Sequence, residues 1–71
     1  MSRRAEWESI EALLPFTPDL TQKKDRTWLC LFFGGLLGYR VPTLNGLTEY
    51  ELVQARRKWE QYLEFYAERE A

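Results

Sequence analysis

The segment that starts at Thr48 most constrains the fold, because its first residues combine several helix-start signals. Thr48 and Glu51 form a capping-box pair, in which the hydroxyl accepts from the third helical N–H and the carboxylate reaches back to the cap N–H. Leu47 and Leu52 match the hydrophobic staple that accompanies this motif. The pattern predicts a helix over residues 49–68, roughly 30 Å long at 1.5 Å per residue.

Apolar side chains repeat along this predicted helix at alternating spacings of three and four, which is typical of a helix-packing seam. The stripe consists of Leu52, Ala55, Trp59, Tyr62 and Tyr66. Its first part, up to Trp59, is expected to pack on the remaining helices. Towards the C-terminus the aromatic surface exceeds what the shorter neighbouring segments can cover.

A first helix is predicted over residues 3–14, with Ser2 as its N-cap and Pro15 as its end, because proline lacks an N–H and restricts the preceding residue. Its apolar face consists of Trp7, Ile10, Leu13 and Leu14. Three acids lie largely off that face and are expected to be solvated. They are Glu6, Glu8 and Glu11.

A second helix is predicted over residues 18–33, because Thr17-Pro18-Asp19 reads as a capping hydroxyl, a proline at the first position and an acid in the first turn. The apolar residues 28–33 also fit a buried strand, but an isolated strand would lack a partner. Two adjacent glycines, Gly34 and Gly35, indicate a stop, a kink or a close backbone contact. Residues 34–47 are expected to form an irregular loop with an Asn45-Gly46 turn.

These segments predict an all-α fold, a small three-helix domain over residues 1–71 with a long C-terminal helix and an irregular Gly/Pro loop before it. The chain has no histidine, and Cys30 is its one cysteine, so neither a disulfide within the chain nor a metal site is expected. Stability must then come from an apolar core and from self-association. An unpaired cysteine favours a reducing, cytoplasmic location.

No enzyme signature is present. Imidazole acid–base chemistry is excluded without histidine, and the glycines from Gly34 to Gly38 lack the lysine and hydroxyl residue of a phosphate-binding loop. Cys30 lies in an apolar segment and is interpreted as an inert core thiol. We therefore expect no catalytic residue, cofactor or metal. The longest apolar run extends over about eleven positions, whereas a membrane span needs about twenty, so no membrane association is expected.

The leading hypothesis is a non-enzymatic protein–protein interaction module. The chain is 15% aromatic, and tyrosine and tryptophan are enriched in binding hot spots. The predicted interaction residues crowd two turns near the C-terminus: Trp59, Tyr62, Phe65 and Tyr66. They are expected to bind another protein, with a homodimer as the favoured complex. The chain would then act as a small assembly factor or as an inhibitor or regulator of a larger protein.

The alternative hypothesis is a small helical nucleic-acid-binding protein that uses two basic clusters. The clusters are Lys23, Lys24, Arg26 and Arg56, Arg57, Lys58. A formal net charge of −1 argues against this function, because nucleic-acid-binding domains are typically basic. Arg56 is also spaced for an ion pair with Glu60 within its own helix. The alternative depends on whether the two clusters converge in space.

Overall fold

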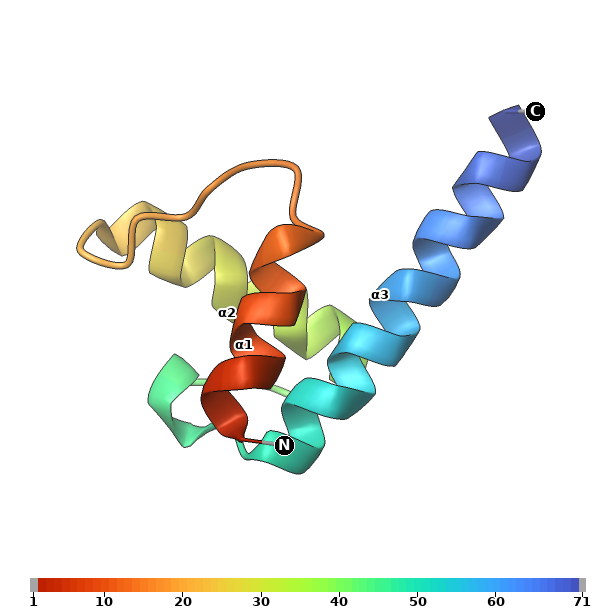
Figure 1. Cartoon of the computed structure of the whole chain (residues 1–71). Coiled ribbons are helices and arrows are strands. Elements are labelled where there is room, and N and C mark those ends of the chain that lie inside the picture. Colours follow the sequence, from red (N-terminus) through yellow and green to blue (C-terminus); the bar gives the residue numbers. More distant parts are fainter. Residues whose placement is uncertain (1, 71) are drawn as a thin grey trace.

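The computed structural model describes residues 2–70, which form three α-helices and one 3-10 turn without any strand (Figure 1). The elements are α1 Arg3–Ala12, α2 Lys23–Leu37, η1 Leu44–Gly46 and α3 Glu49–Glu70. The predicted all-α architecture with a long C-terminal helix after an irregular segment is confirmed. The first half of α3 contacts both α1 and α2, and its second half extends away from the body of the molecule (Figure 1).

The first helix begins as the sequence predicts and ends two residues earlier. The Ala5 N–H donates to the Ser2 hydroxyl oxygen at 3.2 Å, which caps the start of α1. At the other end the Leu13 N–H donates to the Ile10 carbonyl at 2.9 Å, which tightens the last turn. Proline at position 15 disfavours helical geometry in the residue before it, so the helix stops ahead of the predicted end.

The predicted start of the second helix at Pro18 is wrong, because α2 begins at Lys23. The Thr21 N–H and hydroxyl donate to the Asp19 carboxylate at 3.0 and 2.6 Å. The Asp19 N–H in turn donates to the Asp25 carboxylate at 2.8 Å. These bonds stabilise a turn ahead of α2, since short acidic side chains compete with helical hydrogen bonding in this way.

The predicted end of the second helix at Gly34-Gly35 is also wrong, because α2 continues through both glycines and is capped by Gly38, which has a φ of 82°. The Gly38 N–H donates to the Gly34 carbonyl at 2.9 Å, as in a left-handed C-cap. Of the three alternatives for the two glycines, the close backbone contact is confirmed at Gly34, since a Cβ there would lie 3.2 Å from the Tyr39 carbonyl oxygen. The strand alternative for residues 28–33 is excluded by the same helix.

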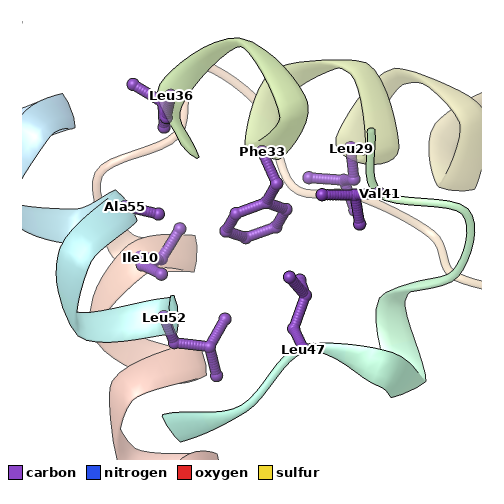
Figure 2. Packing of buried hydrophobic residues seen from close by; sticks show 8 residues of the cluster. All are labelled: Ile10, Leu29, Phe33, Leu36, Val41, Leu47, Leu52 and Ala55. Carbon is purple, nitrogen blue, oxygen red and sulfur yellow. The ribbon is translucent and has the colours of Figure 1, made fainter. Parts of the chain in front are cut away.

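One apolar core joins the three helices (Figure 2). Phe33 lies at its centre, fully buried, with its ring 5.8 Å from that of Trp7 on α1. The other buried members come from all three helices and from the segments on either side of η1: Ile10, Leu29, Leu36, Val41, Leu47, Leu52 and Ala55. The sequence prediction that the first part of the α3 stripe is internal is therefore confirmed for Leu52 and Ala55, which have no exposed surface.

The capping box at the start of α3 forms as predicted. The Glu51 N–H donates to the Thr48 hydroxyl oxygen at 3.1 Å, and the Thr48 N–H donates to the Glu51 carboxylate at 2.9 Å. The staple residues Leu47 and Leu52 are both buried. The Tyr39 hydroxyl also donates to Glu51, so the loop after α2 is bonded to the first turn of α3. This network positions the start of α3, and hence the direction in which its far end projects.

Candidate interaction surface

The long helix α3 has two halves with different environments. In the proximal half, residues 49–60, Leu52 and Ala55 are fully buried and Trp59 is half-buried. In the distal half, residues 61–70, every side chain from Gln61 to Glu68 is exposed. Figure 1 shows the distal half extending beyond α1 and α2. The change of environment falls at Trp59, within an uninterrupted helix.

Trp59 contacts residues of its own chain. Its indole N–H donates to the Leu13 carbonyl at 3.0 Å, and its ring lies edge-on to Phe32 with centroids 5.0 Å apart. Leu13 is the C-cap of α1, and carbonyl groups at the C-terminal end of a helix need hydrogen-bond donors from outside it. Of the four aromatic residues assigned to interaction from the sequence, Trp59 therefore also stabilises the fold.

The other three predicted interaction residues are displayed on the distal half. Tyr62 and Phe65 are each 52% exposed, and Tyr66 is 55% exposed. The rings of Phe65 and Tyr66 lie edge-to-face, with centroids 5.9 Å apart. Leu63 is a further exposed apolar side chain on the same half of α3. The structure thus brings these residues together on one projecting helix end, as their spacing of three and four implies.

The distal half borders an open groove of about 550 Å³ with the end of α2. Gly35 contributes to its width, because nothing lies within 4 Å of the place where a Cβ would stand. The groove is lined by Gly35, Leu36, Lys58, Gln61, Tyr62 and Phe65. The part played by α2 here was not predicted from the sequence, because the predicted second helix ends before Gly35.

The distal half is acidic as well as aromatic. Glu64 and Glu68 lie four residues apart, and residues 61–70 include one further acid, Glu70, and one cation, Arg69. Like charges four residues apart repel each other on a helix, and acids at its C-terminal end oppose the helix dipole. Among the described residues, neither Glu64 nor Glu68 forms an ion pair. An acidic, aromatic helix end is therefore presented to solvent.

A buried ion pair holds the proximal half against α1. The Arg56 guanidinium donates to the Glu6 carboxylate at 2.8 Å and to Glu60 at 3.0 Å. These hydrogen bonds, that to Glu6 first, raise the pKa of Arg56. The predicted pairing with Glu60 is confirmed, but the expectation that Glu6 is solvated is wrong, since it is 1% exposed. The signal was its position four residues before Ile10, which places both on the buried face.

The two basic clusters do not converge. Lys23, Lys24 and Arg26 occupy the first turns of α2, at the end of that helix far from α3 (Figure 1). Arg56 is committed to the ion pair with Glu6, and Lys58 borders the groove beside the distal half. Arg57 is exposed on α3. The two clusters therefore form no continuous basic surface in the described residues. The nucleic-acid alternative depends on such a convergence.

A basic residue outside both clusters lies near the first of them. Arg40, in the loop after α2, lines a second groove together with Lys23 and Arg26. Arg40 was not predicted as part of a basic cluster, because its sequence neighbours Tyr39 and Val41 are uncharged. Only the return of the chain after Gly38 brings it beside the start of α2.

Within residues 2–70 no group of three His, Cys, Asp or Glu side chains is close enough to hold a metal ion. Cys30, predicted to be a core thiol, is half-buried at the second groove. No helix in the described part of the chain is long and apolar enough to cross a membrane.

Comparison with models of protein families, with curated proteins and with solved structures finds no match for the chain.

Proposed function

We propose that this chain is a non-enzymatic protein–protein interaction module that binds through the distal half of α3, with a second copy of itself as the partner. This assigns it to the small assembly factors and inhibitors or regulators, which act by docking rather than by catalysis. The observation that carries the proposal is the exposure of three aromatic rings, Tyr62, Phe65 and Tyr66, on a helix end that the core leaves uncovered. Rings of this kind dominate binding energy at interfaces.

The energetics of the distal half support docking. Isolated helices shorter than about 12–15 residues are marginally stable in water, and most helical stability in proteins comes from tertiary contacts of an apolar face. From Gln61 onwards the helix has lost the buried contacts that stabilise the proximal half. Its glutamates repel each other as well. A second subunit that covers the rings would supply the missing tertiary contacts.

The test is the concentration dependence of sedimentation for the wild-type chain and for the double variant Tyr62→Ala/Tyr66→Ala. We expect reversible self-association of the wild type and an increase of about tenfold or more in the dissociation constant of the variant, since hot-spot side chains each contribute more than about 1 kcal/mol. At concentrations low enough for both proteins to be monomeric, their melting temperatures should be nearly equal, because these rings are outside the core.

Tyr50→Ala is a matched control, because Tyr50 is a 71% exposed tyrosine on the proximal half of the same helix. It should associate like the wild type. A wild-type chain that remains monomeric at high concentration would overturn the proposal. A loss of association in Tyr50→Ala as large as in the double variant would also overturn the proposal, since binding would then not depend specifically on the distal half.

A further inference from the structure

A groove at the opposite side of the molecule from the distal half combines positive charge with apolar surface. It lies between the first turns of α2 and the loop that includes η1, and its volume is about 690 Å³. Three cations line it: Lys23, Arg26 and Arg40. None of its lining residues is acidic. We call this surface the basic groove.

The apolar part of the basic groove is accessible. Leu31 is 72% exposed and Leu20 is 44% exposed, although each lies beside the cations. The Arg26 guanidinium donates to the Leu20 carbonyl at 2.8 Å, which holds both residues in place at the rim. Exposed leucines beside three cations form a surface that an acidic, apolar segment complements.

The distal half of α3 has the complementary chemistry. It presents Glu64 and Glu68 without ion pairs among the described residues, next to the three exposed rings. We propose that the basic groove of one copy receives the distal half of α3 from another copy, so that the chain associates head to tail. This inference rests on the proposed function and names the surface to which its binding helix docks. The glutamates would face the cations, and the rings would cover Leu20 and Leu31.

Charge also argues against the symmetric alternative, in which two distal halves pair with each other. That arrangement brings the glutamates of both copies into one interface, and juxtaposed like charges are unfavourable. The basic groove instead offers three cations. The start of α2 and the end of α3 lie on opposite sides of the molecule, so one copy cannot fill its own groove (Figure 1). A head-to-tail interface of this kind generates rings or open chains of subunits.

Mixing two variants tests the inference. The groove variant is Lys23→Glu/Arg40→Glu, in which both changed side chains are exposed. The helix variant is Tyr62→Ala/Tyr66→Ala. Each alone should lose association by about tenfold or more, because each removes one side of every interface. Mixed together, they should form a one-to-one complex with the wild-type pairwise affinity, because one intact groove meets one intact helix end.

Lys24→Glu is the matched control for the groove variant, since Lys24 is exposed beside Lys23 but does not line the groove. It should associate like the wild type. If the groove variant alone retains wild-type association while the helix variant loses it, the head-to-tail inference fails and the proposed function stands. Loss in both variants without recovery on mixing also overturns the inference. Full association of both variants overturns the inference and the proposed function together.

Discussion

The proximal and distal halves of α3 share one helix and one spacing of apolar residues, yet they differ in what covers them. In the proximal half, Leu52 and Ala55 are sealed in the core, and Arg56 is bound to Glu6 of α1. In the distal half, Tyr62 and its neighbours continue the pattern in solvent. A stripe of constant spacing therefore does not identify a core, because burial depends on how far the neighbouring helices extend.

The two halves should consequently respond differently to mutation. Substitutions in the proximal half remove contacts within the chain and lower the free energy of unfolding. Substitutions in the distal half should leave the fold intact and, according to the proposed function, weaken association. Experiments that measure both quantities on both halves can separate the two roles of one helix.

The largest effect is expected for Leu52→Ala. Its side chain is fully buried, so its removal costs about 3–4 kcal/mol of unfolding free energy through lost apolar transfer and a remaining cavity. Denaturant unfolding followed by circular dichroism measures this loss. Leu63→Ala is the matched comparison on the distal half, since Leu63 is 36% exposed, and it should cost much less. Equal losses at the two positions would contradict the division of α3.

A smaller loss is expected for Arg56→Met, which leaves the Glu6 carboxylate buried without its cation. We expect about 2–3 kcal/mol, because an uncompensated buried charge is costly and the Arg56 side chain retains 20% exposure. The double variant Glu6→Met/Arg56→Met should recover most of this, since it removes both charges. A single variant as stable as the wild type would show that Glu6 does not depend on its partner.

The smallest effect is expected when the pH is lowered and Glu51 at the start of α3 becomes protonated. Hydrogen bonds from Tyr39 first, and from the Thr48 N–H next, lower the pKa of Glu51. A carboxylate with a lowered folded-state pKa adds stability above its ordinary value of about 4.3, and this is lost as the pH falls through the lowered pKa. Protection of the amides in the first turn of α3, measured as the exchange rate relative to the intrinsic rate at the same pH, should therefore fall in acid.

Glu51→Gln is the control for this titration, because glutamine can complete a capping box without a carboxylate. Its first turn should show no such acid-dependent change. An equal loss of protection in Glu51→Gln and in the wild type would show that the Glu51 carboxylate is not its cause.

Features that depend on residues close together in the sequence were predicted correctly, whereas features that depend on more distant residues were missed. The caps at Ser2 and Thr48 were predictable, because each joins residues three apart. The bounds of α2 were missed at both ends. Its start depends on competing bonds of Asp19, and its passage through Gly34 depends on the returning loop at Tyr39. Of the four predicted interaction residues, Tyr62, Phe65 and Tyr66 lie exposed on one helix end, whereas Trp59 packs within its own chain.

By itself the sequence determined the helical fold class, the start of α3 and the aromatic, acidic character of its end, because these follow from periodicity and contacts within a few residues. Tertiary structure alone decided where the core stops along α3, that Glu6 is buried against Arg56, and that Arg40 joins Lys23 in one groove. These outcomes join residues far apart in the chain. Their distances are set by how the helices pack and how the loop after Gly38 returns, which no local pattern specifies.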